Sequence, residues 1–175
     1  MYLNTEIFKG ELLIVSPNNN CEENEQLKWF IENYEPKILQ CLLGQIYYDL
    51  KDHTIVAGDN YDLLLTGGEY TVNGEKYTFK GLKYILACFI YFYYQRENSI
   101  ITSQFGGNTP QFEKADAISL NGKIKRNWNN AQRLLNPKCN CTLNTCDVTL
   151  WEFLSHKEFD CNKYTPKFYE GGFLC

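Results

Sequence analysis

The stretch from residue 80 to residue 96 constrains the fold of this chain most. Between Leu82 and Tyr94 the only charged side chain is Lys83, and aromatic residues are frequent. Two stripes recur at the three-and-four spacing of an α-helix. The first stripe comprises Leu82, Ile85, Leu86, Phe89, Phe92 and Tyr93, and the second comprises Tyr84, Cys88, Tyr91 and Gln95. A helix that is apolar or aromatic on nearly every side must be covered on nearly every side.

Two other interpretations of this stretch are excluded. A membrane span needs about 18 consecutive apolar residues, and this run is shorter and is flanked by Lys80 and Arg96. A buried strand would be shorter and would lack Lys and Gln at these spacings. The helix is therefore either fully buried inside its own fold or has one face reserved for another subunit. The two arrangements are compatible with each other.

Length and charge narrow the class of protein. A chain of 175 residues fits one domain with room for a small appendage. The net charge is −4, and no run of basic residues offers a stripe that would neutralise phosphates, which disfavours nucleic-acid binding through the backbone. The nearest candidate group is interpreted as a solvated helix face; it consists of Lys123, Lys125, Arg126 and Arg133.

The eight cysteines are expected to be reduced. The first residues lack the basic start, apolar run and small-residue cleavage site of a secretory signal, so an intracellular origin is expected.

The first part of the chain predicts an arm and then helices. Apolar groups within residues 1–15 indicate an arm or an edge strand, followed by a loop. A helix is expected from near Asn24, and Pro36 either ends it or starts a second helix. Gly44 is expected to break the helical run, and Gly67 to stop a short helix around residues 61–65.

The clearest turn signal in the chain is Asn73-Gly74, which predicts a β-hairpin over residues 70–79. An isolated hairpin is marginally stable, so one of its faces must rest on the body or on a neighbouring chain. The expected face is either Val72 with Thr78, or Thr71 with Tyr77 and Phe79.

Beyond the hairpin, the central helix is expected to fade at Glu97, with a loop over residues 102–109 and another helix over residues 111–135. A short helix is expected from Val148 to Leu154. The predicted fold is mainly α: a helical bundle around a long aromatic central helix, with one β-hairpin and an irregular Cys-rich C-terminal tail. The predicted division is a helical domain, 1–136, with the hairpin at about 69–79, and a Cys-rich extension, 137–175.

Chemical signatures are sparse. The chain has no phosphate-binding Gly-rich loop and no nucleophile elbow, and His53 and His156 lack the paired spacing of a zinc protease. One group of residues could bind zinc tetrahedrally, with ligands Cys139, Cys141 and Cys146 and either Cys161 or His156. Its spacing departs from the common Cys-x2-Cys knuckle, so free thiols are the preferred interpretation. No catalytic residue, cofactor or metal ligand is assigned.

Several of these segments together resemble a family of phage proteins. The segments are Tyr61-Asp-Leu-Leu, Gly67-Gly-Glu-Tyr70, Lys80-Gly-Leu-Lys-Tyr84, Tyr93-Tyr-Gln-Arg96 and Lys125-Arg-Asn-Trp128-Asn129. The family is that of the head–tail connector (adaptor, ring or head-completion) proteins of tailed bacteriophages, and the most similar versions are those of crAss-like phages. The resemblance covers roughly residues 1–135, and none of its motifs is a chemical signature. The tail after Pro137 departs from the family pattern.

The resemblance implies a structural virion protein of the phage neck and not an enzyme. It implies a homo-oligomeric ring of about twelve copies that joins the portal protein to the tail or to other neck ring proteins. Genomic DNA would pass through the channel without sequence-specific binding, and no membrane would be involved. The protein would be made in the host cytoplasm and would reside in the virion.

Six residues are expected to form the interface of this ring. Tyr84, Tyr91 and Tyr94 represent an aromatic face of the central helix, and Val72, Tyr77 and Phe79 represent the hairpin. The alternative function is a metal-stabilised intracellular binding module with a Cys-rich zinc knuckle. A small enzyme of unknown class is the third interpretation.

Overall fold

The computed structural model describes residues 2–14, 21–52, 59–104, 114–135, 147–157 and 159. The protein is mainly helical with a small three-stranded sheet, which confirms the predicted class at that level. In chain order the elements are two 3-10 turns, η1 (Thr5–Ile7) and η2 (Gly10–Leu12), then α1 (Cys21–Leu43), α2 (Ile46–Lys51), α3 (Asp59–Thr66), β1 (Gly68–Val72), β2 (Glu75–Phe79), α4 (Leu82–Gln104), α5 (Lys114–Leu135), β3 (Asp147–Val148) and α6 (Leu150–His156).

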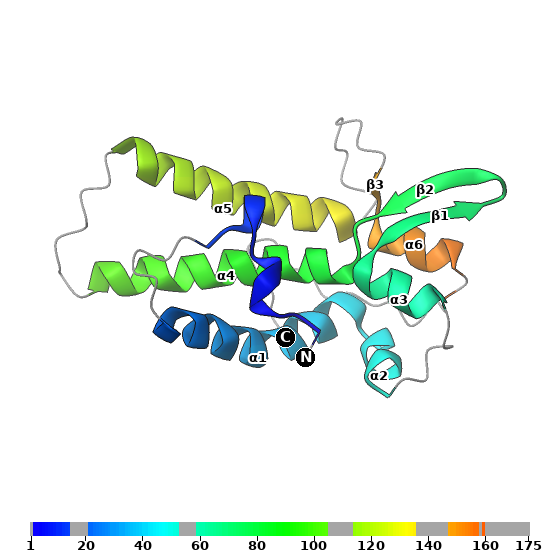
Figure 1. Ribbon diagram of the computed structural model, residues 1–175, viewed down its shortest axis with the longest axis horizontal. Coiled ribbons are helices and arrows are strands. Elements are labelled where there is room, and N and C mark those ends of the chain that lie inside the picture. Colours follow the sequence, from blue (N-terminus) through cyan, green and yellow to red (C-terminus); the bar gives the residue numbers. More distant parts are fainter. Residues whose placement is uncertain are drawn as a thin grey trace.

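Helix α4 runs between α1 and α5 and contacts both (Figure 1). The first residues of the chain, 2–14, cross over α4 and are called the N-terminal strap. Its turn η1 contacts α1 and its turn η2 contacts α4. The sheet and α6 lie at the end of α4 where that helix begins, with the hairpin extending away from the helical body.

The middle of α4 is fully enclosed. Every residue from Ile85 to Tyr91 is 0 % exposed. Of the two arrangements left open by the sequence, a helix buried within its own fold is therefore correct over this stretch. Helix α4 also continues to Gln104, so the predicted fading at Glu97 is wrong. No glycine or proline occurs between residue 97 and residue 104 to stop the helix.

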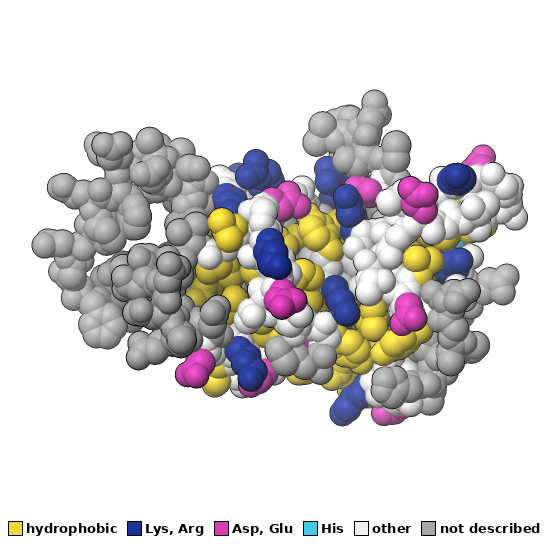
Figure 2. Space-filling view, viewed as in Figure 1, with side chains coloured by type: hydrophobic (Ala, Val, Ile, Leu, Met, Phe, Trp, Pro, Cys, Tyr) yellow, Lys and Arg dark blue, Asp and Glu magenta, His cyan; other side chains and the backbone are white. Residues whose placement is uncertain are grey.

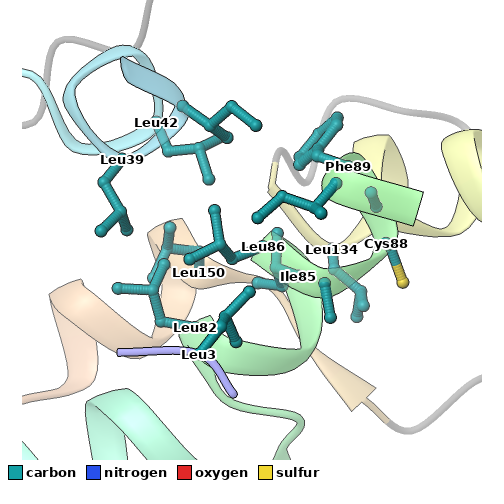
Figure 3. Close-up of a cluster of buried hydrophobic side chains, with 14 of the residues drawn as sticks. Leu3, Leu39, Leu42, Leu82, Ile85, Leu86, Cys88, Phe89, Leu134 and Leu150 are labelled. Carbon is teal, nitrogen blue, oxygen red and sulfur yellow. The ribbon is translucent and has the colours of Figure 1, made fainter. Parts of the chain in front are cut away.

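One hydrophobic core joins elements from the whole described chain. Figure 3 shows side chains from the strap, α1, α5 and α6 converging on α4. The strap contributes Leu3, α1 contributes Leu39 and Leu42, α5 contributes Leu134, and α6 contributes Leu150. Burial of such side chains is the main force that holds the layers together.

Helix α1 passes through Pro36 without a break, so the prediction that this residue ends a helix or starts a second one is wrong. Proline removes one backbone hydrogen bond and crowds the preceding turn. The helix nevertheless continues because Ile31 before the proline and Ile38 and Leu42 after it are buried in the same core. The predicted break at Gly44 is confirmed, since α1 ends at Leu43 and Gly44 has φ +59°.

The short predicted helix near residue 148 is present as α6. Its first turn is closed by a capping box, in which the Thr149 hydroxyl accepts a hydrogen bond from the Glu152 N–H and the Glu152 carboxylate accepts from the Thr149 N–H. Leu150, Phe153 and Leu154 are fully buried in the common core. Residues 147–157, which fall within the predicted extension, thus pack into the helical body.

The structure adds one strand and one disulfide that the sequence analysis did not predict. Strand β3 pairs in parallel with β2, which places Asp147 beside Thr78. Cys41 is disulfide-bonded, so the expectation of reduced cysteines is wrong for this residue, whereas Cys88 is a free and buried thiol. That expectation rested on the first residues of the chain, which carry no information on which thiols meet in the fold.

Among the described residues, no helix has the length and apolarity needed to cross a membrane.

Candidate functional site

The β-hairpin is the candidate interaction site, and its turn forms as predicted. Val72 pairs with Glu75, so the turn contains only Asn73 and Gly74. Asn73 has φ +52° and Gly74 has φ +86°. Positive φ angles at both central residues fit the tight turn that matches the twist of the two strands.

The register of the hairpin assigns its two faces. Tyr70 lies opposite Tyr77, so the inner face combines Tyr70, Val72, Tyr77 and Phe79. The outer face consists of four exposed residues, Glu69, Thr71, Lys76 and Thr78. The two predicted faces, Val72 with Thr78 and Thr71 with Tyr77 and Phe79, are both wrong. A two-residue turn places Val72 on the same face as Tyr77, because side chains alternate along each strand and pair directly across.

The inner face of the hairpin rests on α6 through aromatic contacts. Phe153 stacks on Phe79 with 4.3 Å between ring centroids and meets Tyr70 edge-on at 5.4 Å. The His156 ring lies 4.7 Å from the Tyr77 ring, and its Nδ1 is 3.0 Å from the Tyr70 hydroxyl. Burial raises the pKa of Tyr70 to about 12. These contacts fix the hairpin on the body, which meets the expectation that an isolated hairpin needs support.

Two glycines cross at the base of the hairpin. A Cβ atom on Gly67 would lie 2.4 Å from the carbonyl oxygen of Phe79, and one on Gly81 would lie 2.5 Å from the nitrogen of Gly67. Both have positive φ angles, +76° and +87°. The backbone that enters β1 and the backbone that leaves β2 therefore lie in direct contact. This contact is possible because neither Gly67 nor Gly81 has a side chain. An ion pair between Lys80 and Asp147, at 3.6 Å, joins the same base to β3.

Strand β1 is an edge of the sheet, whose order is β1-β2-β3 in the described part of the chain. The pair that flanks a two-residue turn exchanges hydrogen bonds, and bonded and non-bonded pairs then alternate. The N–H and C=O groups of Glu69 and Thr71 consequently point away from β2. Figure 2 shows polar and charged atoms over the projecting end of the hairpin. Such an edge is a template for pairing with another chain.

The six residues predicted for an interface divide into two groups. Tyr91, Tyr94 and Phe79 are 0 %, 5 % and 1 % exposed, so they belong to the interior and are wrong as surface residues. Lys123 of α5 lies over the Tyr91 ring, Phe30 of α1 meets the Tyr94 ring edge-on, and Phe153 of α6 stacks on Phe79. Val72, Tyr77 and Tyr84 are half-buried and keep part of their surface accessible.

Tyr84 belongs to a polar cluster under the strap. Its hydroxyl donates a hydrogen bond to the Glu11 carboxylate. Burial, followed by this hydrogen bond, raises the pKa of Tyr84, and burial raises the pKa of the neighbouring Cys88 thiol to about 12. Both groups therefore stay protonated near neutral pH, so Cys88 is a poor nucleophile.

A pocket of about 290 Å³ lies beside the start of the chain, between α1 and α2. Its lining consists of Tyr2, Glu35, Pro36, Leu39, Tyr47 and Lys51. Glu35 is 3 % exposed, and its two carboxylate oxygens accept hydrogen bonds from the N–H groups of Tyr2 and Leu3 at 2.7 and 2.9 Å. The Glu35 carboxylate therefore holds the strap on α1.

Metal-ligating side chains do not cluster in the described part of the chain. Five residues considered in the sequence lie outside the described residues: the candidate zinc ligands Cys139, Cys141, Cys146 and Cys161, and also His53. His156, the other ligand considered, is held by Tyr70.

The basic group on α5 is only partly a solvated face. Lys125 and Arg126 are exposed. Lys123 instead donates to the carbonyl oxygen of Leu13 and lies 5.5 Å from the centroid of the Tyr91 ring. The prediction of a solvated face is therefore wrong for Lys123, and no signal in the sequence points to its partner 110 residues away.

Comparison of the chain with protein-family models, with curated proteins and with solved structures gives no match in any of the three.

Proposed function

We propose that this chain is a subunit of a head–tail connector ring of a tailed bacteriophage, a structural virion protein rather than an enzyme. In this proposal a helical bundle around α4 forms the body of each subunit, and the ring joins the portal protein to the tail while DNA passes through its channel. The proposal starts from the resemblance of residues 1–135 to that family.

The observation that carries the proposal is the supported hairpin with an open edge. The aromatic contacts of Tyr70 and Phe79 with Phe153 hold its inner face on α6. Among the described strands β1 pairs with β2 alone, and the outer face of the hairpin carries only polar and charged residues. A rigid hairpin with unpaired backbone groups suits repeated pairing between identical subunits better than it suits binding of a small substrate.

The chemistry of the described residues also favours a structural role. The resolved pKa shifts of Tyr70, Tyr84 and Cys88 are all upward, which keeps these groups neutral at physiological pH. A general acid or base works best with a pKa near the operating pH, and a nucleophilic thiol needs a lowered one.

The test compares two substitutions at one position of the edge strand. Thr71→Pro removes an N–H group that points away from β2, and edge strands tolerate proline at such positions. Thr71→Ala removes the side chain and keeps that N–H. We expect Thr71→Pro to reduce ring formation, since about 1 kcal/mol is lost at each interface and the loss repeats around a closed ring. Thr71→Ala should assemble normally.

A larger change checks the whole element. Replacing residues 72–76 by Gly-Gly should leave a helical monomer, seen by circular dichroism, that no longer enters particles. If this deletion is incorporated normally, the hairpin takes no part in the interface and the proposal loses its main support.

A further inference from the structure

Two buried cysteines of the helical body differ in their chemistry. Among the described residues, Cys41 is disulfide-bonded, whereas Cys88 is a free thiol. Cys41 lies in the last turns of α1 and is 1 % exposed. Its neighbours on the helix, Leu39, Leu42 and Leu43, are buried as well. The disulfide is therefore shielded from solvent at the Cys41 end and belongs to the interior of the fold.

Two of the other seven cysteines are excluded as the partner of Cys41. Cys21 begins the same helix, which continues without a break to Leu43. A rise of 1.5 Å per residue separates the Cα atoms of Cys21 and Cys41 by about 30 Å, whereas a disulfide needs Cα atoms within about 7 Å. Cys88 is excluded because its thiol is free. The cysteines that remain all follow Pro137, and they are Cys139, Cys141, Cys146, Cys161 and Cys175.

These five cysteines lie outside the described residues, so the partner is identified by exclusion of Cys21 and Cys88. For each of the five, the crosslink to Cys41 closes a loop of about 100 residues or more, because Cys139 is the first of them. A crosslink restricts the unfolded chain, and the restriction increases with the length of the loop. The bond is therefore expected to stabilise the fold as a whole.

The part of the chain beyond Pro137 also carries α6. Leu150 and Phe153 of this helix are 0 % exposed, and Phe153 stacks on Phe79 of the hairpin. A covalent link from α1 to this part of the chain limits how far α6 can separate from the helical body. The same link therefore supports the helix on which the hairpin rests.

We infer that Cys41 is joined by a disulfide to the Cys-rich extension, 137–175, and that this bond is a structural staple between the extension and α1. The inference does not depend on the connector proposal. The bond forms when two thiols transfer two electrons and two protons to a low-molecular-weight disulfide such as oxidised glutathione, which becomes two thiols. Because Cys41 is buried, a reductant reaches the bond only when the fold opens. The staple consequently persists as long as the protein stays folded.

Peptide mapping of the full-length protein tests the pairing. The protein is equilibrated with oxidised and reduced glutathione, its free thiols are blocked with N-ethylmaleimide in urea, and trypsin is added without a reductant. Cleavage after lysine and arginine releases Cys41 within residues 38–51. The tryptic peptides that hold the cysteines after Pro137 are 139–157, 158–163 and 168–175. We expect 38–51 to be linked to one of these three peptides in a protein of monomer mass, with Cys88 blocked. A blocked Cys41, a link from Cys41 to Cys21 or Cys88, or a disulfide-linked dimer would overturn the inference.

Thermal unfolding of two alanine variants tests the role of the bond. Cys41→Ala removes a buried sulfur together with the crosslink, whereas the matched control Cys88→Ala removes a buried sulfur that carries no crosslink. In oxidising buffer Cys41→Ala should lower Tm by roughly 10 °C, and Cys88→Ala should lower it clearly less.

The same proteins are then unfolded in urea and refolded with a reducing agent, which opens the buried bond before the melt. The wild type should fall close to the Tm of Cys41→Ala, and Cys41→Ala itself should not change. Loss of a sulfur atom from the core alone would not make the difference between these two proteins depend on the reductant. A wild-type Tm that is equal in oxidising and reducing buffer would overturn the staple even where the mapping shows the bond.

Discussion

Replacing Glu35 by alanine should release the start of the chain from the helical body. The carboxylate is almost completely buried and accepts two short hydrogen bonds, 2.7 Å from the Tyr2 nitrogen and 2.9 Å from the Leu3 nitrogen. Each hydrogen bond to a charged group contributes about 1.5 kcal/mol or more to stability. The substitution should therefore lower the free energy of unfolding by about 3 kcal/mol. For a chain of this size that corresponds to a decrease in Tm of roughly 10 °C.

Urea denaturation followed by circular dichroism measures this loss, and limited proteolysis shows whether the strap is cut first. Glu32→Ala is the matched control, because Glu32 is one turn earlier on α1 and is exposed. It should change the free energy of unfolding by no more than about 0.5 kcal/mol. Glu35→Gln, which keeps one acceptor oxygen, should fall between the two. Equal unfolding midpoints for Glu35→Ala and Glu32→Ala would refute the assignment of Glu35 as the anchor of the strap.

Three further substitutions or reactions test other parts of the structure. Phe153→Ala removes the ring that stacks on Phe79 and should cost about 3–5 kcal/mol in thermal or urea unfolding, whereas the exposed Trp151→Ala should cost little. Gly67→Ala should destabilise the protein by roughly 2 kcal/mol or more, since the new Cβ meets backbone at 2.4 Å; an unchanged Tm would refute the glycine crossing. Cys88, whose pKa is raised from 9.0 to about 12, should resist iodoacetamide at pH 8 until the protein unfolds, and stability should fall as the pH rises from 9 toward 12. Rapid labelling of Cys88 itself in the native protein, detected by peptide mass spectrometry, would contradict its burial.

Sequence patterns predicted the local elements well because the signals were local. The Asn73-Gly74 pair determined the turn, and Gly44 and Gly67 ended helices as expected. Hydrophobic spacing located α4, although its end at Gln104 was misplaced. Turn chemistry and helix periodicity are properties of short windows, so they can be read without knowledge of the tertiary structure.

Long-range packing explains the features that the sequence could not predict. Pro36 lies inside α1 because core contacts on both sides of it outweigh its local cost. Tyr91 is buried in the fold, with Lys123 of α5 over its ring, whereas the tyrosine pattern in the sequence equally suits a core or an interface. The capping box at Thr149 was a readable signal for the start of α6. No window of sequence shows that Phe153 of this helix supports the hairpin.

The most direct test of the connector proposal is electron microscopy of the protein assembled on its portal, or of the virion that contains it. The account predicts a closed ring in which the edge of β1 lies at the boundary between subunits and pairs through the backbone of Glu69 and Thr71. A protein that stays monomeric with the portal, or a ring in which both faces and the edge of the hairpin point into solvent, would contradict it.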